Sequence, residues 1–226
     1  MSWSATGSPT WESGESMHFA SLAENEEDWV SVAYLMDTAT QAGIPAQHID
    51  IESIGWDASR KIFVDLDGAE IKTIFKLYPW EWMMREPFGA HIAESGARFV
   101  ELMWKAVLSC KGILAILWEL FPGHPNLLPA YFDPHGMAEY VKKPLYSREG
   151  ANVEICRPGL AVEATGGRYG AEGHVFQQYA SLPTLDGFHP IVGSWVVGDE
   201  PAGMCIREDR SPVTGNLSAF VPHYFD

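Results

Sequence analysis

The sequence predicts a mixed α+β protein with an α/β first half and an antiparallel-rich second half. A short apolar segment, a helical segment and another short apolar segment follow one another between residues 17 and 51. After residue 150, turn residues separate several short segments of strand character. With 226 residues, of which 46% are hydrophobic, the chain is long enough to bury a core, and this excludes a wholly disordered protein.

The first half alternates between the two kinds of secondary structure. Residues 17–21 predict a buried strand, and residues 29–42 predict a helix because apolar side chains recur every three or four positions until Gly43. Residues 44–51 predict the next strand, so this segment favours a strand–helix–strand unit. Asp67-Gly68 then predicts a hairpin that joins residues 62–65 to residues 70–76.

Two further helices and an antiparallel region complete the predicted elements. The helices are expected at residues 78–88, which are rich in tryptophan, and at residues 111–121. The strands are expected at residues 153–156, 160–164, 175–179, 191–197 and 203–207. The last two should pair across the turn that residues 198–201 form.

Composition excludes several classes of protein. The formal net charge of −15 argues against non-specific binding to nucleic acid or to an anionic membrane. Residues 1–16 have no signal-peptide pattern, and no apolar run is long enough to span a bilayer. Cys110, Cys156 and Cys205 are scattered, which disfavours a zinc site and indicates free thiols in a reducing cytoplasm.

Residues 141–153 (VKKPLYSREGANV) hold the first candidate binding motif. Lys143 follows a segment of strand character, and a short polar loop with Gly150 comes after it. A lysine supplies a point charge, and a small residue lets backbone N–H groups approach an anion, so the pattern suits the polyphosphate of a nucleotide. The spacing is not that of a Walker P-loop. The alternative is a surface turn with solvated charges.

Further motifs accompany this loop, in a fixed order along the chain. They are residues 109–114 (SCKGIL), 121–128 (FPGHPNLL), 176–183 (FQQYASLP), 203–209 (GMCIRED) and 214–216 (TGN). As a set they resemble the glutathionylspermidine synthase family, specifically bacterial ATP-grasp ligase-like proteins related to its synthetase domain. The resemblance runs from about residue 17 to residue 226.

This resemblance implies an ATP-grasp fold that clasps ATP between two lobes. Such ligases transfer the γ-phosphate of ATP to a carboxylate, and an amine then displaces phosphate from the acyl phosphate to form an amide. It also implies three segments. They are an irregular N-terminal segment (1–16), a pre-ATP-grasp-like α/β region (17–98) and an ATP-grasp nucleotide-binding region (99–226).

The resemblance assigns roles to individual residues of this chain. Those matched to ATP binding are Lys111 and Lys143 on the phosphates, Arg148, Glu149 and Gly150 in the loop that covers them, and Gln177, Gln178, Tyr179 and Ala180 in the segment that lines the adenine. Arg207 matches an arginine near the reacting phosphates and is the expected catalytic residue. Glu27 and Asp28 fall near an acidic pair that binds substrate.

Each role has a structural alternative. Lys111 and Lys142 could be solvated lysines, and the side chain of Glu149 could face solvent. Arg207 could form a surface ion pair, and residues 177–180 could be an ordinary strand between lobes. Glu27 and Asp28 could be an acidic helix start that the helix dipole stabilises.

One part of the family pattern is missing. The Mg²⁺ ligands of the family lie in an upstream Arg-x-Asp strand and a Glu-x-Asn strand, and this chain has neither. We therefore expect the chain to correspond to the C-terminal part of a longer ligase, incomplete at its N-terminus, whose partner could be a separate N-terminal chain. The alternative is a catalytically inactive nucleotide-binding or assembly module that lacks the metal site.

Overall fold

The computed structural model of the protein describes residues 15–224 and confirms a mixed α+β architecture. The chain divides into two compact units, Met1–Ala106 and Val107–Asp226, and each is described by itself. The predicted segment 1–16 lies almost wholly outside the described residues. Among the residues described, no helix has both the length and the apolar character that a bilayer-spanning segment needs.

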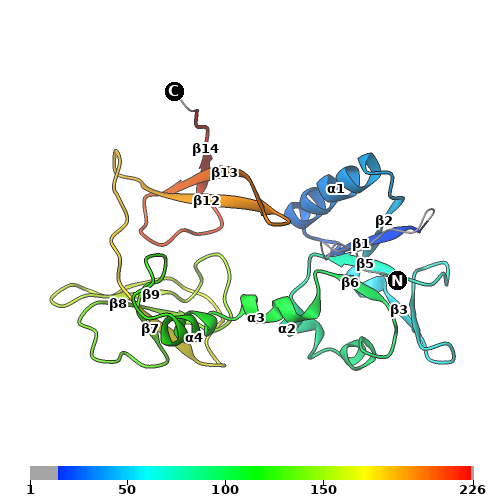
Figure 1. The fold of residues 1–226 in the computed structure, drawn as a ribbon, viewed down its shortest axis with the longest axis horizontal. Coiled ribbons are helices and arrows are strands. Elements are labelled where there is room, and N and C mark those ends of the chain that lie inside the picture. Colours follow the sequence, from blue (N-terminus) through cyan, green and yellow to red (C-terminus); the bar gives the residue numbers. More distant parts are fainter. Residues whose placement is uncertain (1–14, 225–226) are drawn as a thin grey trace. The chain divides into compact units, whose positions relative to one another are not determined.

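A four-stranded parallel sheet organises the first unit. Its order is β2 (Ala46–Asp50), β1 (Met17–Ser21), β5 (Thr73–Lys76) and β6 (Arg98–Val100). Helix α1 (Glu26–Gln41) connects β1 to β2, as Figure 1 shows. This confirms the predicted strand–helix–strand unit.

The start of α1 shows why the helix begins three residues earlier than predicted. The side chain of Asn25 accepts a hydrogen bond from the backbone N–H of Asp28 at 3.2 Å, which caps the helix. The acidic residues that follow Asn25 therefore form the first turn, where the helix dipole favours negative charge. The helix ends before Gly43, which has a φ of +81°. Val32 is fully buried against Phe19 of β1.

The predicted hairpin at Asp67-Gly68 is present only next to its turn, where Val64 forms an antiparallel bridge with Glu70 and the N–H of Ile71 donates to the carbonyl of Phe63 at 2.9 Å. Strand β4 (Ile62–Val64) also pairs with β3 (Gly55–Asp57). Strand β5 instead joins the parallel sheet, where it buries Ile74. The tryptophan-rich segment forms only a short helix, α2 (Trp80–Met83).

Proline explains the early end of α2. Pro87 restricts the residue before it, and Glu86 accordingly adopts extended backbone angles (φ −84°, ψ 156°). The chain continues as a 3₁₀ turn, η2 (Pro87–His91).

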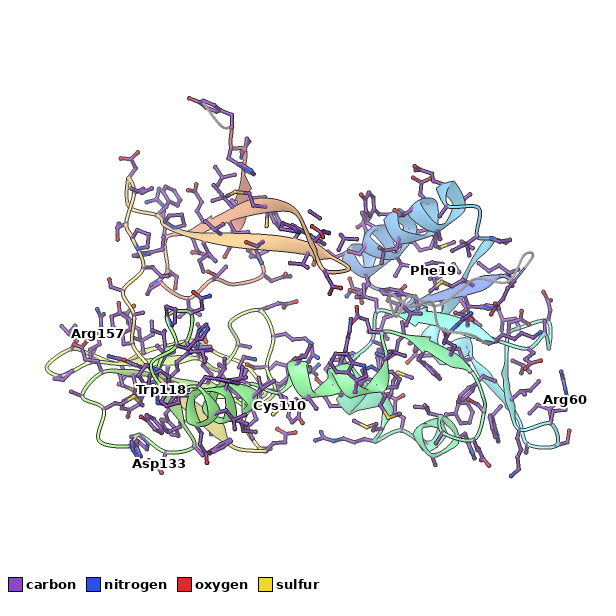
Figure 2. All side chains as sticks on the ribbon, viewed as in Figure 1. Phe19, Arg60, Cys110, Trp118, Asp133 and Arg157 are labelled. Atoms are coloured by element: carbon purple, nitrogen blue, oxygen red, sulfur yellow. The ribbon has the colours of Figure 1, made fainter. Side chains whose placement is uncertain are left out.

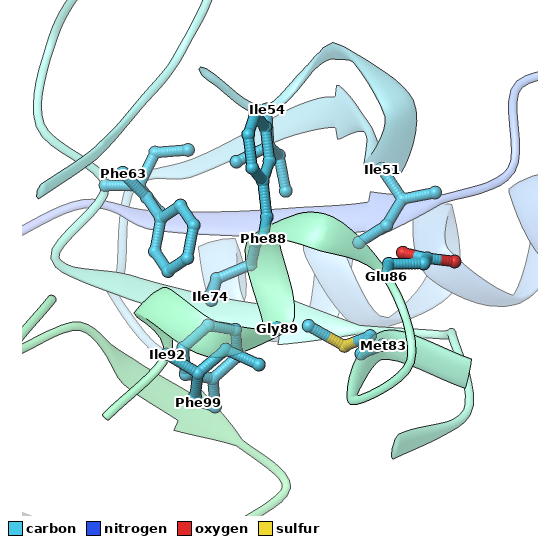
Figure 3. A pocket seen from close by; sticks show the side chains of 11 residues that line it. Ile51, Ile54, Phe63, Ile74, Met83, Glu86, Phe88, Gly89, Ile92 and Phe99 are labelled. Atoms are coloured by element: carbon cyan, nitrogen blue, oxygen red, sulfur yellow. The ribbon is translucent and has the colours of Figure 1, made fainter. Parts of the chain in front are cut away.

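An apolar cluster forms the core of the first unit and leaves a small cavity of about 60 Å³ (Figure 3). Side chains from β4, β5, β6 and η2 line it, with the carboxylate of Glu86 at one side. The hydroxyl of Tyr78 donates a hydrogen bond to Glu86 Oε1 at 2.5 Å. Burial, and then this bond to a carboxylate, raise the pKa of Tyr78 to about 12.

The second unit contains two antiparallel sheets. The larger has the order β10 (Glu163–Ala164), β9 (Glu154–Cys156), β8 (Tyr140–Pro144), β11 (His174–Gln178) and β7 (Ala130–Tyr131). Short helices precede it: η3 (Met103–Lys105), which lies in the first unit, then α3 (Ala106–Ser109) and α4 (Ile113–Leu120). Helix α4 packs on the sheet through Ala115, which lies against Ala130 and the fully buried Val175.

The smaller sheet consists of β12 (His189–Val197), β13 (Glu200–Asp209) and β14 (Ala219–Val221). Strands β12 and β13 form the predicted hairpin, with a register shift after Trp195. Apolar side chains are exposed along this sheet, including those of Trp195, Val196 and Phe220.

We expect Ile74→Ala to destabilise the first unit by about 2–5 kcal/mol, because the truncation leaves a cavity beside a side chain that is only 1% exposed. The matched control is Val30→Ala on α1, where the side chain is 61% exposed and the expected change is within about 0.5 kcal/mol. Urea unfolding followed by circular dichroism measures both. Equal effects of the two substitutions would contradict this account of the core.

Candidate functional site

The alternation of side chains along β8 separates its two lysines. Lys143 points to one face of the sheet and Lys142 to the other. Lys142 Nζ forms an ion pair with Glu154 Oε1 of β9 at 2.9 Å, directly across the strand pair. The two neighbouring lysines therefore have different surroundings.

Lys143 is held by the adjacent strand. Its Nζ donates a hydrogen bond to Gln177 Oε1 of β11 at 2.7 Å. Gln177 lies opposite Val141 in the ladder, which makes it the diagonal neighbour of Lys143 on the same face. Burial of the ammonium group, and then the nearby charge of Lys111, lower the pKa of Lys143.

Lys111, which precedes α4, is tied to the chain after β8. Its backbone N–H donates to the carbonyl of Leu145 at 2.8 Å. Its Nζ donates to the carbonyl of Ser147, a buried residue, at 2.5 Å. Because of these contacts, Lys111 is not the solvated lysine of the alternative interpretation. They also bring Lys111 close to Lys143. Two ammonium groups that are partly withdrawn from water create a local positive potential in an acidic protein. An anion beside them would lower the electrostatic energy of the pair.

The loop after Ser147 turns sharply. Glu149 and Gly150 both have left-handed backbone angles, with φ of +55° and +70°. The carbonyl of Gly150 accepts the hydroxyl of Thr165 at 2.5 Å, and Arg148 Nη2 donates to Ser109 Oγ at 3.3 Å. Consecutive backbone N–H groups in such a turn are suited to an anion, whereas the side chain of Glu149 is not needed there.

Gly150 allows a second loop to approach this turn. A Cβ atom at Gly150 would lie 2.6 Å from the carbonyl oxygen of Thr214, a distance that side chains do not tolerate. The loop between β13 and β14 therefore contacts the loop after β8. This contact brings the neighbourhood of Arg207 to the candidate phosphate-binding loop.

Arg207, on β13, is oriented by that loop. Its Nη2 donates to the carbonyl of Gly215 at 2.8 Å, and its guanidinium lies 5.1 Å from the ring centroid of Phe220. Its Nε atom is buried and has no hydrogen-bond partner among the described atoms. At the end of β13, Asp209 accepts a hydrogen bond from the hydroxyl of Ser218 at 2.5 Å, and this bond is the main cause of the lowered pKa of Asp209.

The predicted adenine segment is only partly free to bind a base. The backbone N–H of Gln178 donates to the carbonyl of Pro129 at 2.8 Å, and that of Tyr179 donates to the carbonyl of Glu139 at 3.3 Å. Recognition of a base at this segment would therefore use the carbonyl groups and the amide of Ala180. The guanidinium of Arg157, the residue after β9, lies over the ring of Tyr179, 5.1 Å from the ring centroid.

The remaining predicted residues belong to the first unit. Glu27 and Asp28 lie in the first turn of α1, as the alternative of an acidic helix start requires. Among residues 15–224, no group of three or more histidine, cysteine, aspartate or glutamate side chains could hold a metal ion.

Sequence reasoning missed the partners that position these groups. Ser147, Thr165 and Thr214 act through main-chain or hydroxyl contacts with residues far away in the sequence. Nothing in a single sequence marks such contacts. The bond between Lys143 and Gln177 depends on the register of two strands, which strand patterns alone do not give.

We expect Gly150→Ala to destabilise the second unit more than Gly159→Ala does. Both glycines have a φ near +70°, so an alanine is strained at either, by about 1 kcal/mol. Only at Gly150 does the added methyl meet another backbone, and Gly159 has nothing within 4 Å. Chemical unfolding measures the difference, and faster amide hydrogen exchange around Thr214 should accompany it. Identical stability of the two variants would show that the loops do not touch.

Comparison with known proteins gives consistent matches. The family model "Glutathionylspermidine synthase preATP-grasp" matches residues 2–226. A proposed acid–amine ligase of Haemophilus influenzae is 46% identical over 92% of this chain and 56% of its own length. The trypanothione synthetase of Crithidia fasciculata is 30% identical over 90% of this chain and 35% of its own length.

A solved structure also matches. The D-cycloserine synthetase DcsG has 18% sequence identity and a TM-score of 0.48, over 79% of this chain and 64% of the other. The chain spans between about a third and a little over half of the length of the two relatives above. Because the family model covers nearly the whole chain, this protein belongs to the glutathionylspermidine synthase preATP-grasp family.

Proposed function

We propose that the Val107–Asp226 unit binds ATP and that the chain serves a carboxylate–amine ligase. The observation that carries this proposal is the convergence of Lys111 and Lys143 beside a sharply turned, glycine-containing loop. Phosphoryl transfer requires the protein mainly to position the phosphates and to neutralise charge. Lys111 and Lys143 supply that charge, and the amides of Glu149 and Gly150 are the proposed hydrogen-bond donors, since the next two amides donate to carbonyl groups of the protein.

The proposed reaction proceeds through an acyl phosphate. A carboxylate oxygen of one substrate attacks the γ-phosphorus of ATP, and ADP leaves. The nitrogen of an amine then attacks the acyl carbon, phosphate leaves, and an amide results. Arg207, on β13, donates a hydrogen bond to the loop that contacts the proposed phosphate-binding loop, and a guanidinium there can fork onto a phosphoryl or carboxylate oxygen.

The relatives support the ligase class, since the names of two of them describe an acid–amine ligase and a trypanothione synthetase. We assign the carboxylate and amine substrates only as classes, with Glu27 and Asp28 as the proposed substrate-binding carboxylates. Cys110, Cys156 and Cys205 are free thiols, which is consistent with a reducing cytoplasm.

A second function is nucleotide binding without turnover. The observation that favours it is the lack of a metal-binding cluster among residues 15–224. In this case no partner would supply Mg²⁺ ligands, whereas in the ligase function the family's upstream acidic strands would come from a further segment or another chain. The two functions differ in whether an added upstream segment would produce turnover.

We expect Lys143→Ala to weaken ATP binding by about 1.5–3 kcal/mol, roughly 10- to 150-fold, because one charge-assisted contact is lost. The control is Lys142→Ala, which removes the same charge from the opposite face of the same strand, where Lys142 pairs with Glu154. Isothermal titration calorimetry measures both affinities. If the two variants lose affinity equally, the phosphate assignment is wrong and the effect is one of net charge.

The segment around Ala180 should make the unit prefer ATP to GTP. The edge of guanine reverses the donor and acceptor positions that adenine presents to a backbone carbonyl and amide. Mismatched buried polar groups are costly, so we expect a preference of at least about tenfold, or 1.4 kcal/mol. Competition titrations with the two nucleotides test this, and equal affinity would rule out base recognition by residues 178–180.

The chain of 226 residues should bind ATP with weak dependence on Mg²⁺ and should release little phosphate. Lysine and arginine side chains attract a nucleotide by charge alone, whereas turnover also needs a metal that organises the transferring group. Phosphate release with mixed peptides and polyamines measures this. Adding the remaining segment of the Haemophilus influenzae relative as a separate chain should restore Mg²⁺ dependence. Robust substrate-stimulated hydrolysis by the chain alone would contradict the prediction.

A further inference from the structure

A hollow of about 400 Å³ lies between α4 and β7, at the end of the helix that is remote from Lys111. We call it the α4–β7 hollow. The side chains that give it chemical character are Trp118, Glu119, Tyr131, Phe132, Asp133 and His135. Figure 2 labels Trp118 on α4 and Asp133 on the loop after β7. Its volume is within the range of small-molecule sites.

Aromatic rings form the walls, and two of them are fixed in place. The indole Nε1 of Trp118 donates a hydrogen bond to the hydroxyl of Tyr131 at 3.1 Å. The ring of Tyr131 stacks on His135, with centroids 3.9 Å apart and planes 16° apart. Phe132 remains 58% exposed at the rim. These faces carry the negative part of the aromatic quadrupole, which attracts cations.

Three further sources of negative potential meet at the same place. Helix α4 ends at Leu120, and its last turn has no basic residue, so the negative end of the helix dipole is not compensated by a side chain of the helix itself. Glu119, in that turn, adds a carboxylate with an exposed side chain. Asp133 adds a second carboxylate, whose Oδ1 accepts the backbone N–H of His135 at 2.7 Å and lies 3.9 Å from His135 Nδ1.

No lysine or arginine lines the hollow among the described residues, so His135 is the only basic side chain there. A carboxylate near the carboxyl end of a helix is unfavourable unless a cation lies beside it. Among the residues that line the hollow, Asp133 has His135 beside it, whereas no lysine or arginine compensates Glu119. The hollow also offers an apolar floor, formed by Ala115 and Ala130, on which an alkyl stem can lie.

We infer that the α4–β7 hollow binds an organic cation with a short apolar chain, of the kind that an alkylamine or a lysine side chain carries. The ammonium group would lie between the carboxylates of Glu119 and Asp133, and the methylene groups would lie against Trp118 and Tyr131. This site is separate from the candidate ATP site, because Lys111 and Lys143 line no part of it. It does not depend on the proposed ligase activity.

The test follows the indole N–H signal of Trp118 in nitrogen–proton NMR spectra of the full chain, assigned with Trp118→Phe. We expect n-butylammonium to shift this signal in a saturable manner. The neutral analogue 1-butanol should bind at least about tenfold more weakly, since it has the same stem without the charge. A blocked Gly-Lys-Gly peptide forms a second arm: if it competes with n-butylammonium, the hollow accepts a protein side chain, and if it does not, the hollow takes free amines.

Two variants separate charge at the hollow from charge of the whole protein. Glu119→Gln should weaken n-butylammonium binding about five- to tenfold, as expected for the loss of one charged partner. Asp199→Asn, at the exposed turn between β12 and β13, removes the same charge elsewhere and should leave the affinity unchanged. An unmoved Trp118 signal at millimolar amine, equal binding of 1-butanol, or equal effects of the two variants would each overturn the inference.

Discussion

The pairing of β8 with β11 is the interaction on which the candidate site depends. The ladder places Lys143 opposite Val175, and Val175 is fully buried under α4. Burial of one side chain on β11 therefore fixes the register of both strands. A slip by one residue would turn Lys143 to the face that Lys142 now occupies and would separate it from Lys111 and Gln177. The position of a charged group is thus decided by apolar packing on the neighbouring strand.

The same arrangement places the charge of Lys143 at an energetic cost. Lys143 is partly removed from water and lies beside Lys111, and both effects, burial first, lower its pKa. One uncharged acceptor, Gln177 Oε1, offsets part of this cost. An anion that reaches both lysines would remove the repulsion, so its binding and the stability of the unit are linked. A more stable protein could be made at this position, but it would lose the charge that the proposed nucleotide site requires.

Local patterns in the sequence were sufficient for much of the fold. The span of β1, the helix α1 and the hairpin of β12 and β13 follow from periodicity and turn residues, because each is decided by neighbours along the chain. The pairing of β5 could not be read in this way. Its apolar residues suit a hairpin as well as a central parallel strand, and the burial of Ile74 in the parallel sheet decides between the two.

The candidate site shows the same division. Lys143 and Gly150 were evident from a lysine followed by a glycine-containing loop, whereas the role of Lys111 came only from resemblance to a family. The approach of Thr214 to Gly150 joins segments more than sixty residues apart and leaves no local signal other than the glycine itself. The sequence therefore indicates which chemical groups are present, and the fold decides which of them meet.

The small sheet of β12, β13 and β14 has a consequence for handling the protein in solution. It exposes Trp195, Val196 and Phe220, and its outer strands β12 and β14 offer backbone edges to other molecules. At neutral pH the net charge of −15 keeps copies of the chain apart. That repulsion vanishes near the isoelectric point of about 4.8, and salt screens it. Repulsion between copies of the chain therefore comes from acidic residues along the whole sequence. The apolar surface through which copies could associate is that of three strands.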